Sequence, residues 1–264
     1  MPLAAVVKTI WYARGTKAEF DVPEPIVPDG CVELVLNLAD CFVQVDAGGT
    51  RQPRELLVGQ MTRPTIASPT GEVDLIGIRF WPGRAGAVLR TPMWELQDQL
   101  IAASSVLPWM EGLADGMREL PHGERLGRLT SALSPYCARV APERLRSVDA
   151  ALAQIATTGG TLSIDALAAR TGITRRHLER QFRNQVGLGI KQMARITRIQ
   201  SVIALVRSER SLSGAEVAAR FGYSDQAHLI HECRALTGRT PRRLHTTERS
   251  LSGLMREQRW RVPS

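Results

Sequence analysis

Two stretches of the chain repeat one another: LAARTGITRRHLERQFRNQVGLGIKQM (167–193) and VAARFGYSDQAHLIHECRALTGRTPRRL (217–244). Six positions align between them, at a spacing of 50 or, after one inserted residue, of 51. Ala168, Ala169, Arg170, Gly172, Leu178 and Gly187 match Ala218, Ala219, Arg220, Gly222, Leu229 and Gly238. Chance does not easily produce six such matches. We therefore interpret the two stretches as copies of one structural unit.

Each copy has the pattern of a helix-turn-helix. Small residues in a short first helix allow a second helix to pack closely against it. Gly172 and Gly222 supply the positive φ of a tight turn. Thr174 in the first copy and Ser224 in the second are then expected to cap the second helix, because a hydroxyl there can accept a backbone N–H.

The second helix of each copy is predicted to have one apolar and one polar face. Leu178 and Phe182 form the apolar stripe in the first copy, as Leu229 and Cys233 do in the second. The polar face consists of Arg175, Arg176, Glu179, Arg180 and Arg183 in the first copy and of Gln226, His228, His231 and Arg234 in the second. Side chains of these types reach base edges in a DNA major groove. An ordinary helical hairpin would not need so many arginines there, so the pattern predicts DNA reading.

Residues 190–207 between the copies read as one amphipathic helix of about 18 residues, or about 27 Å. A rod of that length can hold two recognition helices about one DNA turn, 34–36 Å, apart. A single chain could then read two successive major grooves. Arg195 and Arg198 on this helix are phosphate contacts or part of a solvated face, and Thr174, Ser224 and Arg234 are further candidates for contacts to the DNA backbone.

Charge divides the chain in the same way. Residues 1–140 carry 13 Lys and Arg against 16 Asp and Glu, a net charge of −3, whereas residues 141–264 carry 21 against 10, a net charge of +11. Twenty of the 21 are Arg, which favours bidentate contacts to phosphate or guanine. On composition alone, a solvated basic surface or a coding bias toward Arg remains an equal alternative to a nucleic-acid partner.

Residues from about 145 to 245 resemble the DNA-binding domain of the AraC/XylS family of bacterial transcription regulators. The resemblance rests on LAARTGITRRHLERQF in the first copy and, above all, on VAARFGYSDQAHL followed by GRTPRRL (238–244) in the second. It implies base-reading positions at Arg176, Glu179, Arg180, Gln226, His228 and His231, with Ala227 limited to apolar contact. Where the family usually has two aromatic residues in the last helix, this chain has Leu229 and Cys233, so we expect a looser second unit with the same fold.

The first half of the chain has a β-like texture up to about Arg90. Four short apolar or alternating runs, separated by Pro, Gly and Asp, are predicted to be strands: 31–38, 41–47, 54–61 and 73–80. This spacing predicts a small barrel or sandwich. Leu96, Leu100 and Ile101, and then Leu126, Leu129 and Leu133, recur at helical intervals, and Pro108, Pro121 and Pro135 are expected to bound these helices. The second leucine stripe is either core or a dimerisation seam.

The stretches VPDGCVELVLNL (27–38) and GIRFWPGRAGAVL (77–89) resemble an uncharacterised domain often found in front of such DNA-binding domains. That resemblance implies a cupin-like β-barrel followed by helices, in which family members sense a small molecule or dimerise. Cys31 and Glu33 are the residues of the first strand that could lie near a ligand, although a structural role is favoured for both.

Enzyme chemistry has little support in the sequence. Cys31, Cys41, Cys137 and Cys233 form no CxxC pair, and no His occurs before His122, so histidine-ligated metal chemistry is excluded from the first 121 residues. Cys31 and Cys41 are a redox pair or, more simply, buried thiols on neighbouring strands. His228 and His231 could share a helix face, but no third ligand accompanies them. We find no phosphate-binding loop, nucleophile elbow or HExxH motif.

These observations predict an α+β chain in three parts. Residues 1–140 form a small cupin-like β-barrel plus helices, residues 141–247 form an all-α domain with two helix-turn-helix units on a long linker helix, and residues 248–264 form a basic tail. Pro142 is placed to open the first helix of the second part. No secretory signal and no run of 18 apolar residues is present, so we expect a cytoplasmic, nucleoid-associated protein.

The predicted function is sequence-specific regulation of transcription. Because most regulators of the family that the chain resembles are activators, we expect an activator. Double-stranded DNA is the expected partner, and a small-molecule effector, RNA polymerase and a second copy of the chain are further candidates. No cofactor, metal, catalytic residue or membrane is expected. The alternative is a DNA-repair or modification enzyme that uses the same DNA-binding domain, and a first domain that only dimerises is a third reading.

Overall fold

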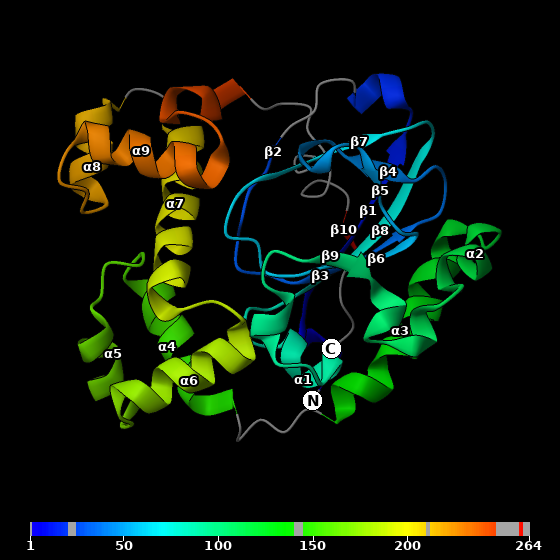
Figure 1. Cartoon of the computed structure of the whole chain (residues 1–264), viewed down its shortest axis with the longest axis horizontal. Helices are drawn as coiled ribbons and strands as arrows, with labels where there is room; N and C mark the ends of the chain where they lie inside the picture. Colours follow the sequence, from blue (N-terminus) through cyan, green and yellow to red (C-terminus); the bar gives the residue numbers. More distant parts are fainter. Residues whose placement is uncertain (1, 21–24, 140–144, 210–211, 247–258, 261–264) are drawn as a thin grey trace.

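The computed structural model describes residues 2–20, 25–139, 145–209, 212–246 and 259–260. Two domains lie side by side in Figure 1, one rich in strands and one built of helices around the long helix α7. The α+β class predicted from the sequence is therefore confirmed. The predicted boundary at Ala141 and the helix start at Pro142 lie outside the described residues, as does the predicted tail 248–264 apart from a short strand at 259–260.

The strand-rich domain contains two antiparallel sheets. The larger has the order β10-β1-β8-β3-β6-β9, with bounds Arg259–Trp260, Val7–Gly15, Val73–Phe80, Glu33–Asn37, Glu55–Val58 and Leu100–Ala102. The smaller has the order β2-β7-β4-β5, with bounds Pro25–Ile26, Thr65–Pro69, Phe42–Gln44 and Thr50–Arg51. Short 3-10 turns η1, η2 and η3 lie at Leu3–Ala5, Lys17–Phe20 and Val45–Ala47.

Of the two predicted alternatives, a small barrel or a sandwich, the described residues form the sandwich. The strands within the described ranges form two sheets that do not hydrogen-bond to each other, so the domain is an open sandwich. The edge strands β5 and β9 have only two and three residues, which leaves little backbone with which to close a barrel. The four predicted strands are confirmed: β8 has the predicted bounds, whereas β3, β4 and β6 are shorter than predicted.

Strand β1 is the long strand that sequence patterning did not predict. It pairs with β8 from Val7↔Phe80 to Gly15↔Val73. Ile10 and Trp11 are both fully buried, on opposite faces: Ile10 packs beneath the helices and Trp11 packs between the two sheets. A strand buried on both faces lacks the clean alternation of apolar and polar residues by which a strand is normally recognised.

The helices predicted around Leu96 and Leu100 are also wrong. Residues Met93–Leu96 form one 3-10 turn, η4, and Leu100–Ala102 form strand β9, which pairs with β6. Asp98 has a φ of +56°, and its carboxylate accepts hydrogen bonds from the N–H and the hydroxyl of Thr62 at 2.6 and 2.7 Å. This local bonding turns the chain out of the helix and into the sheet.

Helices cover the outer face of the larger sheet. Their bounds are Ala85–Leu89 for α1, Leu113–Arg118 for α2 and His122–Ala138 for α3, with 3-10 turns η5 and η6 at Ala103–Ser105 and Pro108–Met110. Pro121 precedes α3 as predicted, but Pro135 lies inside it. Ser131, four residues before Pro135, is exposed, so its backbone carbonyl, which receives no N–H from Pro135, lies on the solvent side.

The leucine stripe of α3 belongs to the core of the domain. Leu129 and Leu133 are fully buried in the cluster that includes Ile76 and Phe80 of β8. The buried Arg125 guanidinium also ties α3 to the sheet, since its Nη1 donates to both carboxylate oxygens of Asp74 at 2.9 and 3.1 Å. Among the described residues of α3, the leucines therefore leave no exposed seam.

The helical domain packs around α7. Its elements are α4 Arg146–Thr157, α5 Ile164–Thr171, α6 Arg175–Val186, α7 Ile190–Ser208, α8 Gly214–Arg220, α9 Gln226–Thr237 and the 3-10 segment η8 Pro241–Thr246. Eight residues of α7 are buried: Ile190, Met193, Ile196, Ile199, Val202, Ile203, Leu205 and Val206. No helix of the described residues is both long and apolar enough to cross a membrane.

All four cysteines are buried, and none of them forms a disulfide within the described residues. Cys31 and Cys41 precede strands of different sheets, so the expectation of neighbouring strands is wrong, whereas the expectation of free thiols is confirmed. The different sheets follow from the order of the strands, since β3 pairs with β6 and β8 and β4 pairs with β5 and β7.

Gly77 allows the closest approach within the larger sheet. A Cβ at this position of β8 would lie 1.9 Å from Cε2 of Trp11, which is fully buried on β1. We predict that Gly77→Ala lowers the free energy of unfolding by about 1–3 kcal/mol, because Trp11 would have to leave its position. Urea unfolding followed by circular dichroism measures this difference.

Gly116→Ala is the matched control. Gly116 is exposed on α2, and a Cβ there meets no atom within 4 Å. Alanine at an open helix position should raise stability by about 0.5–1 kcal/mol. Equal effects of the two substitutions would contradict the packing assigned to Trp11.

Candidate nucleic-acid interface

The first helix-turn-helix unit has the local structure that the sequence predicts. The Ser163 hydroxyl accepts the N–H of Ala166 at 3.2 Å and caps α5. Gly172 then turns the chain with a φ of +69°. The Thr174 hydroxyl accepts the N–H of His177 at 3.3 Å, so the predicted cap of α6 is confirmed. Two caps and one left-handed glycine thus set the angle between α5 and α6.

The second unit is built in the same way with different caps. Ser213 and Glu216 form a reciprocal capping box at the start of α8, and Gly222 turns the chain with a φ of +69°. The prediction that Ser224 caps the next helix is wrong. Asp225 caps α9, because its carboxylate accepts the N–H of His228 at 2.8 Å. The preference for Asp at this position was the signal in the sequence that could have identified it.

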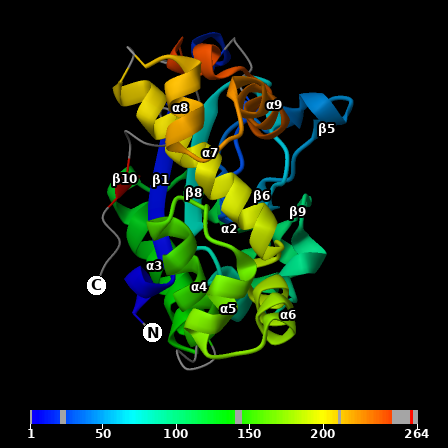
Figure 2. The same ribbon diagram turned by 90° about the vertical axis from the view of Figure 1, so that its left-hand side faces the viewer.

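Both second helices bury the predicted apolar stripe and expose the predicted polar face. Leu178, Phe182, Leu229 and Cys233 are fully buried. The exposed residues are Arg175, Arg176, Glu179, Arg180 and Arg183 on α6 and Gln226, Ala227, His228, His231 and Arg234 on α9. Figures 1 and 2 show α6 near one end of α7 and α9 near the other, and in Figure 2 both lie to the same side of α5 and α8.

In the apolar stripe of α9, Leu229 and Cys233 stand where two aromatic residues are usual in the family that the chain resembles. The second unit still closes, because Tyr223 is buried beside them and joins the same core cluster. Leu236 and Leu244 extend this cluster toward η8.

The arginines of α6 differ in how many partners their guanidinium groups have within the protein. Arg175 is bound on two sides, with Nε donating to Glu179 at 3.0 Å and Nη1 donating to Asp165 at 3.2 Å. Hydrogen bonds to these two carboxylates raise its pKa. Arg175 therefore braces α6 against the start of α5. Among the described residues Arg176 has no hydrogen-bond or ion-pair partner, which leaves its guanidinium available to a ligand.

Arg180 and Arg183 make one contact each. Nη2 of Arg180 lies 3.2 Å from Nδ1 of His177, one turn earlier on α6. The guanidinium of Arg183 lies 5.9 Å from the ring centre of Trp94, which belongs to η4 of the strand-rich domain. Trp94 is 44% exposed, and no feature of its sequence context indicated this contact. Arg183 thus contributes to the junction between the domains as well as to the exposed face of α6.

Two of the arginines of the linker helix, Arg195 and Arg198, hold the units together. Arg195 donates from Nε and Nη2 to the two carboxylate oxygens of Glu232 on α9, at 2.9 and 2.8 Å. These hydrogen bonds hold the pKa of the Glu232 carboxyl below its usual range. Arg198 donates to the carbonyl of Gly160 at 2.7 Å, and its guanidinium lies 5.4 Å from the Tyr223 ring centre. A role for either in phosphate binding remains a prediction.

Ser224 orients His228 on the face of α9. Nδ1 of His228 lies 3.1 Å from the Ser224 hydroxyl and 3.5 Å from the Ser224 backbone nitrogen. A backbone amide can only donate, so Nδ1 is the acceptor and the neutral ring carries its proton on Nε2. The edge-on packing of Tyr223 at 5.2 Å holds the ring from another side. His228 therefore presents an N–H donor, which suits an acceptor such as guanine O6 or N7.

A groove lies between the two units. Its lining includes Arg175 at the start of α6, Lys191 and Arg195 on α7, and His228 and Glu232 on α9. Among all the charged side chains of the lining, Arg175, Lys191, Arg195 and Arg198 outnumber Asp165 and Glu232, so the concave side of the domain favours an anionic partner.

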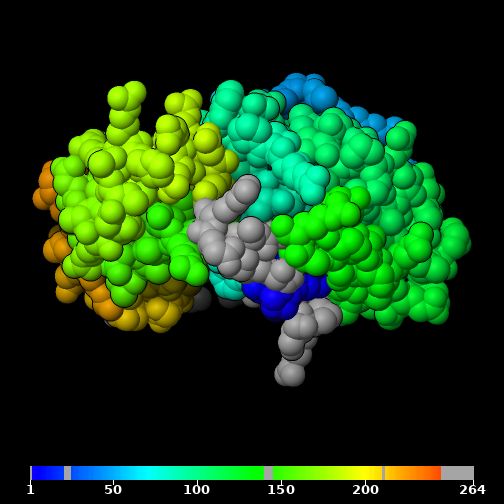
Figure 3. Space-filling view, turned by 90° about the horizontal axis from the view of Figure 1, so that it is seen from below, coloured from blue at the N-terminus to red at the C-terminus, as the bar shows by residue number. Residues whose placement is uncertain are grey.

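The strand-rich domain holds the C-terminal end of α6. This helix packs against η4 and α1, and Figure 3 shows the two domains meeting along this junction. At the turn after α6, a Cβ on Gly187 would lie 2.5 Å from Oε1 of Gln60 and 2.6 Å from the carbonyl oxygen of Met93. An ion pair between Arg84 and Asp149 of α4, at 2.9 Å, lies at the same junction. The first reading helix is thus oriented by both domains.

Comparison with known proteins finds one domain family in each half of the chain. Residues 167–247 match a helix-turn-helix domain family, and residues 1–102 match a domain family of unknown function, DUF6597. Over 81 residues the chain is 33% identical to the F1 operon positive regulatory protein of Yersinia pestis, which covers 31% of this chain and 27% of that protein. The chain therefore matches about a quarter of that relative's length.

Two solved structures are similar in outline. ToxT from Vibrio cholerae O395 is 9% identical with a TM-score of 0.46, and covers 90% of this chain and 97% of its own. The C-terminal domain of AraT, a response regulator from Geobacillus stearothermophilus, is 20% identical with a TM-score of 0.36, and covers 38% and 84%. These values are too low to bear on function.

The capped double helix-turn-helix unit and the match to its domain family identify residues 167–247 as a helix-turn-helix domain. Over this domain the chain is similar to AraC-type regulators of transcription.

Ser224→Ala tests the orientation of His228. Loss of the hydroxyl should free the His228 ring, cost up to about 1 kcal/mol of affinity for a selected site, and relax the preference at one base position. Selection of binding sites from a random pool, followed by sequencing, measures both effects. Ser208→Ala, at the end of α7, is the matched control, and an unchanged base preference in Ser224→Ala would refute the positioning role.

Proposed function

We propose that the chain reads two successive major grooves of duplex DNA with α6 and α9. The observation that supports this proposal is the exposure of both polar faces near opposite ends of α7, a helix of 19 residues and hence about 28 Å. Half-sites one helical turn apart are 34–36 Å from centre to centre, which such a rod can span. One chain would then recognise a bipartite site.

The side chains divide into three roles in this proposal. Arg176, Glu179 and Arg180 of α6, with Gln226, His228 and His231 of α9, contact bases. Arg183 and Arg234 lie further along the same faces and contact phosphates, together with the groups around Thr174 and Ser224. Arg175, Arg195 and Arg198 act mainly within the protein, because each already has acidic or carbonyl partners.

The strand-rich domain modulates DNA binding in this proposal. Its contacts to α6 provide the physical link, since any rearrangement of η4 or α1 changes the support of the first reading helix. A small molecule or a second copy of the chain would act through this domain, and RNA polymerase is the further partner of an activator. The protein would work in the cytoplasm, on the nucleoid.

The alternative of a repair or modification enzyme has no observation in its favour. Among the described residues, no three His, Cys, Asp or Glu side chains gather in a way that could hold a metal. Burial raises the pKa of the Cys137 thiol to about 11 and of the Cys233 thiol to about 12, so both remain protonated and weakly nucleophilic near neutral pH. We therefore propose no catalytic role.

Salt dependence tests the DNA-binding proposal. Affinity for fluorescent genomic fragments should fall with salt at a log–log slope of about −0.9 per phosphate contacted, because counterions are released on binding. Fluorescence anisotropy across a series of salt concentrations measures the slope. No affinity for any duplex at low salt would overturn the proposal.

Arg180→Ala tests the assignment of base readers. The substitution should cost about 1–3 kcal/mol on a selected site and much less on random duplex. Arg128→Ala, an exposed arginine of α3, is the control and should change neither affinity. An equal loss on selected and random DNA would make Arg180 a phosphate contact instead.

A further inference from the structure

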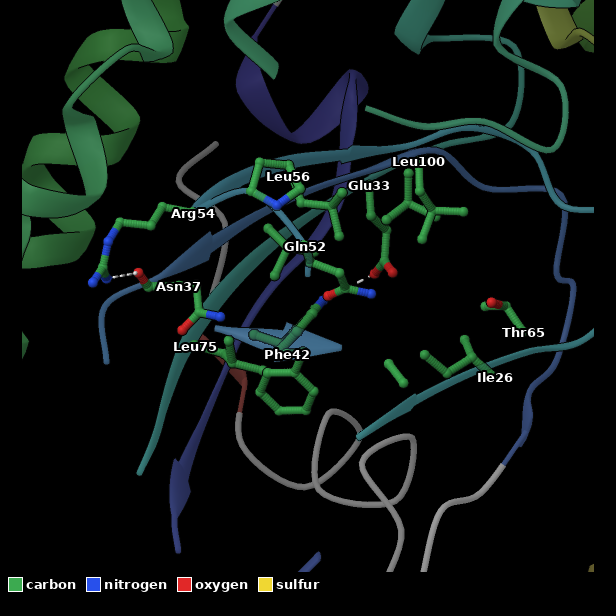
Figure 4. A pocket seen from close by; sticks show the side chains of 15 residues that line it. Ile26, Glu33, Asn37, Phe42, Gln52, Arg54, Leu56, Thr65, Leu75 and Leu100 are labelled. Atoms are coloured by element: carbon green, nitrogen blue, oxygen red, sulfur yellow. Dashed lines mark hydrogen bonds between the residues drawn. The ribbon is translucent and has the colours of Figure 1, made fainter. Parts of the chain in front are cut away.

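A cavity of about 60 Å³ lies between the two sheets of the strand-rich domain. Its walls are mainly apolar, and Figure 4 shows side chains such as Ile26, Phe42 and Leu100 surrounding it. About 10–15 Å³ holds one water-sized atom group, so this volume suits a molecule of about four to six heavy atoms. The cavity is too polar to be a simple packing defect, as two of its lining side chains show.

Glu33 and Asn37 of β3 place polar groups in this cavity that protein atoms do not satisfy. Both residues are buried, at 8% and 3% exposure. The side-chain amide of Asn37 has no hydrogen-bond partner among the described residues, and its Oδ1 is fully buried. Oε1 of Glu33 accepts from Nε1 of Trp11 at 2.9 Å, whereas Oε2 receives no hydrogen bond from the described chain.

Two oxygen acceptors, Oε2 of Glu33 and Oδ1 of Asn37, indicate the ligand that the cavity would take. A buried polar group without a partner costs free energy, which a ligand with hydrogen-bond donors would recover. The carboxylate of Glu33 repels an anionic head. Arg54 is directed away from such a head, because its Nε pairs with Asp115 at 3.7 Å and its Nη1 donates to the carbonyls of Asn37 and Ala39. A short apolar body with an ammonium or hydroxyl head fits both the walls and the acceptors.

We propose that this cavity is an effector site for a small amine or alcohol with an apolar body, whose head binds Glu33 and Asn37, and that Glu33 transmits its occupancy to α7. The inference rests on the proposed role of this domain in modulating DNA binding. The cavity is the binding site, and a series of polar contacts runs from it to α7.

That chain of contacts begins at the carboxylate of Glu33. Oε1 of Glu33 also accepts from Nε of Arg79 at 2.6 Å, so the same oxygen lies between the cavity and the arginine. Nη1 of Arg79 lies 3.1 Å from Oδ2 of Asp29, beyond the end of β3. Asp29 in turn accepts the N–H of Cys31 at 2.9 Å, which braces the loop 28–31.

The loop 28–31 rests directly on the linker helix. The carbonyl of Pro28 accepts a hydrogen bond from Nε2 of Gln200 on α7 at 2.6 Å. Gly30, with a φ of +76°, approaches Met193 of α7 so closely that a Cβ would lie 2.5 Å from its sulfur. Four polar contacts therefore connect the cavity to the helix that carries both helix-turn-helix units.

A donor head in the cavity would compete with Arg79 for Glu33. Arg79 would then shift its interaction toward Asp29, and the loop 28–31 would change its position on α7. Because α7 supports α6 at one end and α9 at the other, a small displacement at Met193 and Gln200 alters the spacing or angle of the two reading helices. Occupancy of the cavity would thus change DNA affinity without any contact to DNA.

The first experiment measures binding to the full-length protein by ligand-observed NMR, with 1-butylamine, 1-butanol and butyrate as probes of matched size. We expect butylamine and butanol to bind and butyrate to bind at least about tenfold more weakly, the difference that one hydrogen bond to a charged group makes. Equal binding of all three, or preference for butyrate, would overturn the ligand class.

Variants then locate the bound probe. Glu33→Gln should weaken butylamine by about tenfold, and Ala67→Leu, which fills the cavity from its wall on β7, should abolish binding of both probes. Glu72→Gln, an exposed residue between β7 and β8, is the control and should bind as the unmodified protein does. Ala67→Leu keeps the test decisive if Glu33→Gln does not fold. Undiminished binding in Ala67→Leu would place the site elsewhere.

Gln200→Ala tests the connection to α7. This variant should bind butylamine as before, yet the change in DNA affinity that saturating butylamine causes in the unmodified protein should be lost. A retained response would refute the contact chain. Failure of the proposed function gives a different result, because the protein would then bind no duplex at all while butylamine binding and its loss in Ala67→Leu would persist.

Discussion

Burial of α7 is the constraint on which the rest of the helical domain depends. Its residues Ile196, Ile199 and Val202 lie at the centre of the core, so neither helix-turn-helix unit is a separate body. The Arg195–Glu232 pair adds a directed contact to this nonspecific burial and fixes α9 against the helix. Two reading helices on one rigid rod bind DNA with less loss of conformational freedom than two units on a flexible linker would.

The two units read with different chemistry because their surroundings differ. On α6, Asp165 and Glu179 engage Arg175 and leave Arg176 free, so charge is concentrated at one position of the helix. On α9 the polar face carries Gln and His, and Ser224 selects the tautomer of His228. In the proposed binding mode, the first unit would supply most of the attraction to phosphate and guanine, whereas the second would depend on hydrogen-bond direction.

The domains share a continuous structure through contacts of two kinds. At one end the C-terminal turn of α6 fits against η4 so tightly that Gly187 has no room for a side chain. Nearer the middle, the loop 28–31 lies on α7 and is held by Asp29, whose pKa stays low despite burial because Arg79 and Lys8 stabilise its charge. Signals from the strand-rich domain thus have two physical routes, one to the first reading helix and one to the rod.

The sequence by itself determined the helical domain, because its signals are local. Repeated glycines, caps and a 3.6-residue period specify α5 to α9 and place Arg176, Arg180 and His231 on exposed faces without reference to any distant residue. Tertiary structure alone decided the rest. Strand β1 is buried on both faces, the segment at Leu100 joins a sheet because Asp98 bonds to Thr62, and Glu33 meets Arg79 and Trp11 only after three strands pair. Contacts between residues so far apart in the chain produce no periodic pattern in the sequence, so only the folded structure reveals them.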